Sequence, residues 1–144
     1  MASDPQTFCQ ACMDGDAALV AQLLTKDPSL ANCSGAVRAD HREFMKTQGA
    51  DQGWTALHLA SHYGQAAIVK LLIENGADVN AIASNAIGNT PIMAAIAGRN
   101  LETIGYLIKA GADLQMKDKN GFNAIDAAET SKDERIVEAV KNIR

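Results

Sequence analysis

The chain has 144 residues, of which 47% are hydrophobic and 21% charged, a balance typical of one globular domain and not of a disordered segment. Its net charge of −4 argues against a nucleic-acid surface, which would be expected to be basic. No apolar run approaches the roughly 18 residues of a membrane span, and the N-terminus lacks the features of a secretory signal, so we expect a cytoplasmic protein.

The first predicted unit, residues 1–32, is a pair of helices that caps the N-terminal end of the domain. Asp4-Pro5 is typical of a helix start, and Gly15 interrupts the helix. The second helix is predicted by its apolar residues, Leu19, Val20, Leu23 and Leu24. Gln22 replaces an apolar residue of the later units, which suits the polar outer face of an end unit.

Three cysteines, Cys9, Cys12 and Cys33, are an odd number without a pairing framework. Cys9 and Cys12 form a C-x-x-C, which occurs in redox pairs and in halves of zinc sites. A redox pair normally lies in a βαβ context, and a zinc site needs about four ligands. Neither accompanies this motif, so we interpret these residues as reduced cysteines on a helix.

Residues 33–52 form an insertion that makes this connection 16 residues longer than the period of 33 seen later in the chain. Asp40 predicts the start of a short helix, residues 41–47, in which Phe44 and Met45 are the only large apolar residues. Two interpretations stay open: a binding element, because long loops in compact domains are usually functional or disordered, and a tolerated surface loop. In the second interpretation Phe44 docks against the first two units.

Residues 53–87 form the clearest unit. Thr55 predicts an N-cap, Leu57 and Ala60 give the first helix an apolar stripe, and Gly64 supplies a left-handed end. A second helix follows with a broad apolar face, formed by Ile68, Val69, Leu71, Leu72 and Ile73. Because aromatic residues are only 4% of the chain, we expect a core of thin layers of Ala, Leu, Ile and Val.

The same plan recurs over residues 88–120 and, shortened and more charged, over residues 121–144. Thr55 and Thr90 are 35 residues apart, and Thr90 and Asn123 are 33 apart. A period near 33 made of helix pairs predicts a solenoid, because one pair cannot bury its own apolar face and must stack on its neighbours.

Two short motifs, Thr-Ala-Leu-His at 55–58 and Thr-Pro-Ile at 90–92, closely resemble the ankyrin repeat. The resemblance is weak over residues 4–32 and good over residues 53–144. It implies an all-α ankyrin-repeat solenoid of stacked helix–turn–helix units with extended turn tips. Four such units, the first and last acting as caps, would make residues 1–144 a single domain.

The third unit departs from the plan. Pro91 follows its expected cap, Thr90, at the first helical position, where a missing N–H costs nothing. The glycine of the helix turn comes one residue early, so Arg99 or Asn100 must adopt the tight geometry, and asparagine tolerates it better. Gly105 weakens the second helix by ~1 kcal/mol relative to alanine, which marks either a soft spot or close packing between layers.

Motifs for catalysis are scarce. His58 and His62 lie four residues apart on one helix, but the glutamate of a metalloprotease helix is missing between them. The sequence contains no phosphate-binding loop, no nucleophile elbow and no dinucleotide-binding glycine pattern. We therefore expect no enzyme, no cofactor and no metal. The resemblance implies a structural role for His58, which would tie neighbouring loops together by hydrogen bonds.

The resemblance also implies that partners dock on the turn tips and on the concave face of the first helices. The variable positions that map there are Asp51, Gln52, Trp54, His62, Tyr63, Ile87, Asn89, Met93, Ala97, Gly98, Lys119, Asn120, Phe122 and Thr130. Phe44 of the insertion is a further candidate for partner binding. Trp54, Tyr63 and Phe122 matter most, because exposed aromatic residues anchor interfaces. The alternative for Trp54 and Phe122 is that they cover the insertion or each other.

We therefore predict a non-catalytic protein–protein interaction module, a monomeric scaffold that binds another protein and neither nucleic acid nor a membrane. The rival hypothesis is a small-molecule or metal site beneath the insertion of residues 33–52, built from His41, His58 or His62 with Cys33. A third possibility is that the chain guards or inhibits the product of a neighbouring gene.

Overall fold

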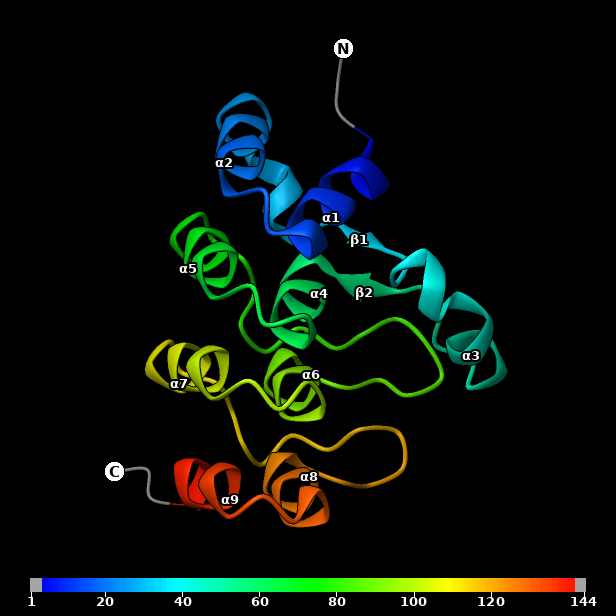
Figure 1. The fold of residues 1–144 in the computed structure, drawn as a ribbon, viewed down its shortest axis with the longest axis vertical. Helices are drawn as coiled ribbons and strands as arrows, with labels where there is room; N and C mark the ends of the chain where they lie inside the picture. The colour runs from blue at the N-terminus through cyan, green and yellow to red at the C-terminus, as the bar shows by residue number, and fades with distance from the viewer. Residues whose placement is uncertain (1–3, 142–144) are drawn as a thin grey trace.

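The computed structural model describes residues 4–141, which form pairs of antiparallel helices stacked in layers (Figure 1). The first helices of the pairs are α1 (Pro5–Asp14), α4 (Ala56–His62), α6 (Pro91–Ala97) and α8 (Ala124–Ser131). The second helices are α2 (Ala17–Lys26), α5 (Ala66–Glu74), α7 (Leu101–Lys109) and α9 (Glu134–Lys141). First helices form one column and second helices another, so the predicted all-α solenoid is confirmed.

The insertion leaves the stack between the first two layers. It follows a 3₁₀ turn, η1 (Pro28–Asn32), and contains β1 (Ser34–Gly35), η2 (Ala39–His41) and α3 (Arg42–Thr47). β1 pairs antiparallel with β2 (Trp54–Thr55), which leads directly into α4. At the other side, Gly49 accepts from the N–H of Ala86 at 3.0 Å and Gly53 accepts from Ser84 at 2.8 Å, so the insertion lies beside the loop between α5 and α6 (Figure 1).

The short helix predicted in the insertion is present, but Asp40 does not cap it. The helix begins at Arg42, after His41, and its N-terminus has no side-chain cap. The Asp40 carboxylate instead lies 3.5 Å from the guanidinium of Arg38. Phe44 is 69% exposed, so the expectation that it docks against the first two units is wrong.

The caps of the first helices follow the predictions in part. Thr55 accepts from the N–H of His58 and completes a reciprocal capping box with that side chain, as predicted for an N-cap. Asn123 and Asp126 form the same arrangement in the last layer. Thr90 forms no cap bond, contrary to the prediction, and α6 begins there because the fixed backbone of the following proline is preset for a helix.

The left-handed residue after α6 is Arg99, at φ 57°, and the preference for Asn100 was wrong. Asn100 is needed elsewhere: it is the N-cap of α7, and its side-chain oxygen accepts from the N–H of Thr103 at 2.9 Å. The glycine stays at position 98 because a Cβ there would lie 2.1 Å from the carbonyl oxygen of His62. Close contact between α4 and α6 therefore decides where the glycine sits.

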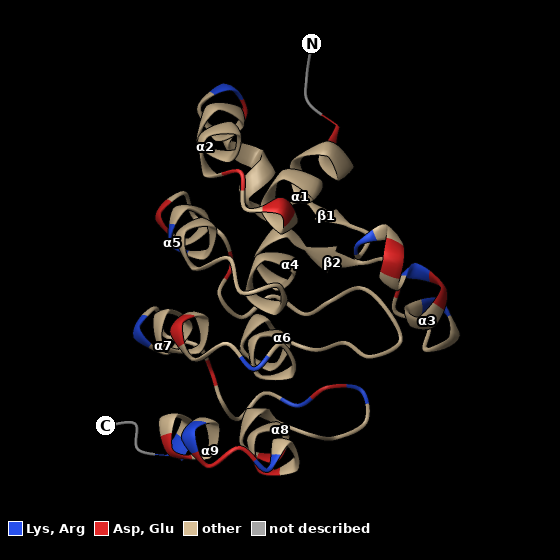
Figure 2. Cartoon of the chain, in the orientation of Figure 1, with Lys and Arg blue, Asp and Glu red and all other residues tan. Residues whose placement is uncertain are grey.

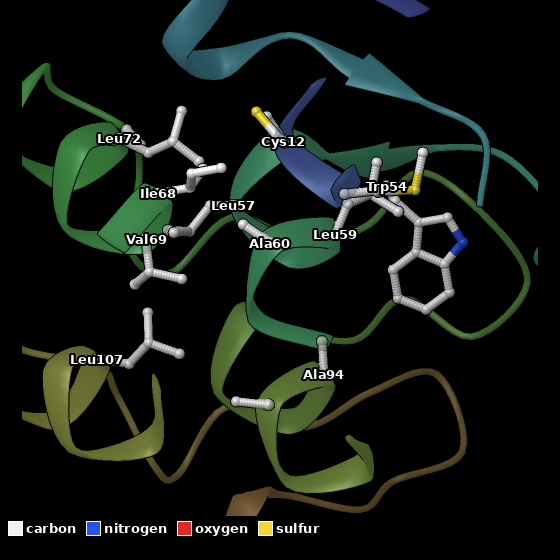
Figure 3. Close-up of a cluster of buried hydrophobic side chains, with 14 of the residues drawn as sticks. Cys12, Trp54, Leu57, Leu59, Ala60, Ile68, Val69, Leu72, Ala94 and Leu107 are labelled. Atoms are coloured by element: carbon white, nitrogen blue, oxygen red, sulfur yellow. The ribbon is translucent and has the colours of Figure 1, made fainter. Parts of the chain in front are cut away.

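The core lies between the two columns and between successive layers. Figure 3 shows buried side chains from α4, α5, α6 and α7 meeting there: Leu57, Leu59, Ala60, Ile68, Val69, Leu72, Ala94 and Leu107. All eight of these side chains are aliphatic, as the low aromatic content predicted. None of the described helices combines the length and the apolar composition that crossing a bilayer requires.

Asparagines at the ends of the units link successive layers. The side chain of Asn32 donates to the carbonyl of Gly76 at 3.1 Å and accepts from the N–H of Asp78 at 2.8 Å. One layer further on, Asn80 accepts from the N–H of Asp113 at 2.7 Å. These bonds join successive layers where the units end.

Gly105 offers a direct test of this helix packing. An added Cβ would meet no heavy atom within 4 Å, so close packing does not explain the glycine. We expect Gly105→Ala to raise the free energy of unfolding by ~1 kcal/mol in urea denaturation. Gly111→Ala is the matched control: its Cβ is equally free of neighbours, but its φ of +96° should make alanine destabilising. A loss of stability in Gly105→Ala would contradict the prediction.

Candidate functional site

A groove runs between α6 and α8 and continues toward the insertion. One part is a cavity of about 440 Å³ lined by Met93, Ile96, Ala97, Arg99, Asp118, Phe122, Asp126, Ala127, Thr130 and Ser131. The adjoining part is a cavity of about 330 Å³ lined by Met45, Trp54, His62, Ile87, Asn89, Met93, Ala94, Ala97, Asp118, Phe122, Asn123 and Ala127. Both cavities share Met93, Ala97, Asp118, Phe122 and Ala127, so they form one groove with a mostly apolar lining.

The insertion contributes one end of this groove. Met45 comes from α3 and Trp54 from β2, where the chain re-enters the stack. Phe122, which is 56% exposed, lies on the loop before α8 where the two cavities join, and Arg99, Thr130 and Ser131 line the part away from the insertion. The long connection is therefore part of the groove's lining as well as a surface loop.

Several predicted partner-binding residues meet in this groove, and others lie outside its lining. Trp54, His62, Ile87, Asn89, Met93, Ala97, Phe122 and Thr130 line it. Gln52, Lys119 and Asn120 are exposed on the loops, and Asp51 is half-buried. Phe44 is exposed on α3.

Trp54 is not the exposed aromatic that we expected. Only 6% of it is exposed, because it packs between the insertion and α4, and its indole N–H donates to the carbonyl of Ala50 at 2.5 Å. Its ring also meets that of His58 edge to face at 5.7 Å. The alternative, that Trp54 covers the insertion, is the one that the structure confirms.

Asn89 and Met93 are also more buried than turn-tip or surface positions would be. Asn89 is 7% exposed because the loop that carries it lies against α4, where its carbonyl accepts from His58 Nε2 at 2.7 Å. Met93 is buried on α6, and only its edge lines the groove. They belong to the floor of the groove and not to its rim.

Tyr63 holds the insertion against α4. Its hydroxyl accepts from the backbone N–H of Arg38 at 3.2 Å and is 2.8 Å from Nδ1 of His41. The imidazole of His41 stacks on the Tyr63 ring, and the Arg38 guanidinium lies 5.3 Å from the ring centroid. Burial raises the pKa of Tyr63, so the hydroxyl keeps its proton at neutral pH.

The space beneath the insertion does not suit the rival hypothesis. A cavity of about 40 Å³ lies there, lined by Val37, His41, Met45, Trp54, Leu59, His62 and Tyr63. Small-molecule sites usually have several hundred Å³. Among residues 4–141, no three His, Cys, Asp or Glu side chains form a group that could hold a metal. His41, His58, His62 and Cys33 are thus not assembled into one site.

Comparison with known proteins agrees with this architecture. A family model described as ankyrin repeats, in three copies, matches residues 5–118. The chain belongs to the ankyrin-repeat family. The count of four repeats stays a prediction, because α8 and α9 lie beyond the matched residues.

Relatives of this ankyrin-repeat chain are much longer proteins. It is 34% identical over 112 residues to ankyrin repeat and SAM domain-containing protein 6 of Rattus norvegicus, which covers 78% of the chain and 11% of the relative. It is 36% identical over 92 residues to Rabankyrin-5 of Mus musculus, and this match covers 63% of the chain and 8% of the relative. It is 40% identical over 76 residues to human BCL-6 corepressor-like protein 1, and this match covers 53% of the chain and 4% of the relative. The chain thus spans about a tenth or less of these relatives.

His58 has the role that the ankyrin resemblance implied. A carbonyl can only accept, so Nε2 donates to Asn89, and Nδ1 is left to accept from the N–H of Thr55 at 3.3 Å and from its hydroxyl at 2.7 Å. Both nitrogens of the neutral ring are used. Burial lowers the pKa of His58 to about 4, and it also lowers the pKa of His62.

The cysteines of this ankyrin-repeat chain are free thiols, but they are closer together than the sequence suggested. Cys9 and Cys12 are buried on α1, and Cys33 reaches α1 from the start of the insertion, with its Sγ 3.8 Å from that of Cys9. The hydrogen bond between the two thiols raises the pKa of Cys9 and lowers that of Cys33. Burial raises the pKa of Cys12 to about 12.

Some groove residues were missed from the sequence: Met45 as a groove residue, Ile96, Arg99, Asp118, Asp126, Ala127 and Ser131. A usable signal was present for Asp126, because counting from the aligned Thr55 and Asn123 places it at the position of His58. In α4 that position faces the next layer, whereas in α8 no layer follows among the described residues. Asp126 lines the groove between α6 and α8, where its Oδ2 also accepts from the N–H of Asn123 at 3.0 Å.

Replacing Trp54 should destabilise the protein. We expect Trp54→Ala to lower the free energy of unfolding by about 3–5 kcal/mol, through the lost burial and the cavity left behind. Phe44→Ala, at the exposed aromatic of the same insertion, is the control and should change it by less than ~0.5 kcal/mol. Urea denaturation measures both, and equal effects of the two variants would contradict this assignment.

Burial of neutral His58 should make stability depend on pH. Its pKa is 6.5 in the unfolded chain and about 4 when folded, so between these values the unfolded state binds the extra proton. Stability is then full above pH 6.5 and falls as the pH drops toward 4, by about 3 kcal/mol at ~1.4 kcal/mol per pKa unit. Urea unfolding should show that the free energy of unfolding falls less between pH 7 and pH 5 in His58→Gln than in the wild-type protein. An unchanged drop would contradict the prediction.

Proposed function

We propose that this ankyrin-repeat domain docks a partner protein in the groove between α6 and α8, beside the insertion and Phe122, without catalysing a reaction. The supporting observation is the continuous groove, which is lined mainly by apolar side chains and opens beside an aromatic residue that is 56% exposed. An aromatic side chain of this kind is a common anchor of protein interfaces.

The family gives the proposal its general direction. Ankyrin repeats are in general protein–protein interaction modules and are typically non-catalytic. A relative such as E3 ubiquitin-protein ligase KEG of Arabidopsis thaliana, 28% identical over 118 residues, is an enzyme by name, but the match covers 7% of it. The finer assignment, to this groove, rests on the geometry of this chain.

Ala97 offers the sharpest test. It is exposed at the end of α6 and lines both parts of the groove, so Ala97→Arg should fill the groove without disturbing the core. The matched control is Ala67→Arg, at an exposed position of α5 that does not line the groove. Both changes should alter the free energy of unfolding by less than ~0.5 kcal/mol.

The measurement is affinity purification from the native cell with quantitative mass spectrometry. A partner that docks in the groove should be recovered with wild type and Ala67→Arg and reduced about tenfold or more with Ala97→Arg, because a large charged side chain would occupy its place. Equal recovery with Ala97→Arg would show that the partner binds elsewhere.

A further inference from the structure

Asn89 leaves a polar atom unused at the floor of the groove. The residue is 7% exposed, and its backbone carbonyl is already occupied by His58. Its side-chain Oδ1 is buried and accepts no hydrogen bond from any described residue. Buried acceptors are normally satisfied, and Asn89 lines the cavity, so its unpaired oxygen points to a donor supplied by a ligand.

Asp118 adds a negative charge to the same part of the groove. It is the only carboxylate or permanent charge among the described residues lining that cavity, since the other titratable side chain there, His62, has a pKa lowered by burial and is neutral at pH 7. Asp118 Oδ1 accepts from the N–H groups of Asn120 at 2.9 Å and Phe122 at 3.0 Å. Its Oδ2 accepts from no described residue, so one oxygen is held in place and the other is available.

Neighbouring cations do not neutralise this charge. Figure 2 shows acidic and basic residues side by side on the loop that leads into α8. Lys119, however, extends to the next loop and donates to the carbonyl of Asn85, and Arg99 donates to the carbonyl of Ser131 at 3.1 Å. Among residues 4–141, no Lys, Arg or His forms an ion pair with Asp118. The charge therefore faces the groove unpaired.

The apolar lining suits the stem of a long basic side chain. Met45, Trp54, Met93 and Phe122 line the same cavity as Asn89 and Asp118. Arginine and lysine bury their methylene stems against such surfaces while the charged head reaches polar partners, and aromatic faces attract the cation. A guanidinium has five N–H donors in a planar fork, whereas an ammonium is a point charge, so arginine is better suited to two separate acceptors.

We propose that the groove takes an arginine side chain from an apolar-flanked segment of the partner protein, with Asp118 Oδ2 and Asn89 Oδ1 as its acceptors. This inference rests on the proposed docking function and names the chemistry of the docked segment. The complementary charge of the partner is positive, and the residues on either side of the arginine are apolar.

The test begins with selection of phage-displayed 12-residue random peptides on the immobilised protein. Enriched peptides should carry an arginine beside apolar residues, and fluorescence anisotropy then measures their affinity. Asp118→Asn keeps one oxygen for the loop N–H groups, but it removes the charge and replaces the free acceptor oxygen with an N–H donor. It should therefore weaken binding about 10- to 100-fold, as expected for loss of a hydrogen bond to a charged group. Replacing the peptide arginine by its neutral isostere citrulline should weaken binding similarly.

The matched control is Asp113→Asn. Asp113 makes the same turn contact, accepting from the N–H of Gln115 at 2.9 Å, but it does not line the groove. Asp113→Asn should leave the affinity for the peptides unchanged. Asn89→Leu is the second variant, because it removes the other acceptor at similar volume and leaves the backbone carbonyl for His58. Thermal melts by circular dichroism verify that each variant is folded.

The outcomes separate this inference from the docking proposal. Enriched peptides without a basic residue, equal binding of the citrulline peptide, or full affinity of folded Asp118→Asn and Asn89→Leu would overturn the arginine assignment. If such peptides still lose binding to Ala97→Arg, docking in the groove stands. Peptides that bind Ala97→Arg as well as wild type would overturn both. Failure to enrich any peptide, or a dimer in sedimentation that occupies the groove, would also overturn the arginine assignment.

Discussion

The constraint on which the structure depends is the close stacking of first helices. A single helix pair leaves an apolar face uncovered, and only the next pair can bury it. Small residues make this contact close: Ala60 of α4 and Ala94 of α6 are buried in the region where the layers meet, and Gly98 has no room for a Cβ beside the carbonyl of His62. The layers are therefore placed by backbone contact, and polar bonds between them are satisfied only at that spacing.

The bond from His58 to Asn89 depends on this spacing. The imidazole is buried, which costs free energy unless both nitrogens are paired, and the partner of Nε2 is supplied by the next layer. The same bond holds the loop of Asn89 against α4. Its side chain is thereby buried without a partner, which gives the groove floor its unused acceptor. A structural bond between layers thus creates a polar feature at the candidate site.

The repeated features could be predicted from the sequence because they arise from local rules. The cap at Thr55, the left-handed Gly64 and the apolar faces of the second helices all follow from spacing and backbone preference, and the structure agrees with them. The period near 33 implied stacking, because each unit needs a neighbour. These features follow from the same local rules in every unit.

The predictions failed where two segments far apart in the sequence meet. Trp54 was expected to be exposed because it maps to the turn tips where partners dock, and because Asn89 and Phe122 at the aligned positions show that the fold does not require tryptophan there. It is buried because the insertion, which the other units lack, folds over it and pairs β1 with β2. Arg99 took the left-handed conformation because the glycine was needed one residue earlier, against α4. Neither contact has a signature within the unit concerned.

The three aligned positions show how one site of the repeat can serve different purposes. Trp54 fills it with a buried ring that supports the insertion, Asn89 with a buried amide that has an unused oxygen, and Phe122 with a half-exposed ring. All three line one cavity, because the loops that carry them stand in successive layers. Stacking therefore brings three residues, spaced 35 and 33 apart in the sequence, onto one surface: Trp54 at one side, Asn89 at the base and Phe122 at the exposed edge. The insertion forms one end of this surface. Trp54 holds the insertion in place through its hydrogen bond to Ala50, and the insertion in turn brings Met45 to the groove.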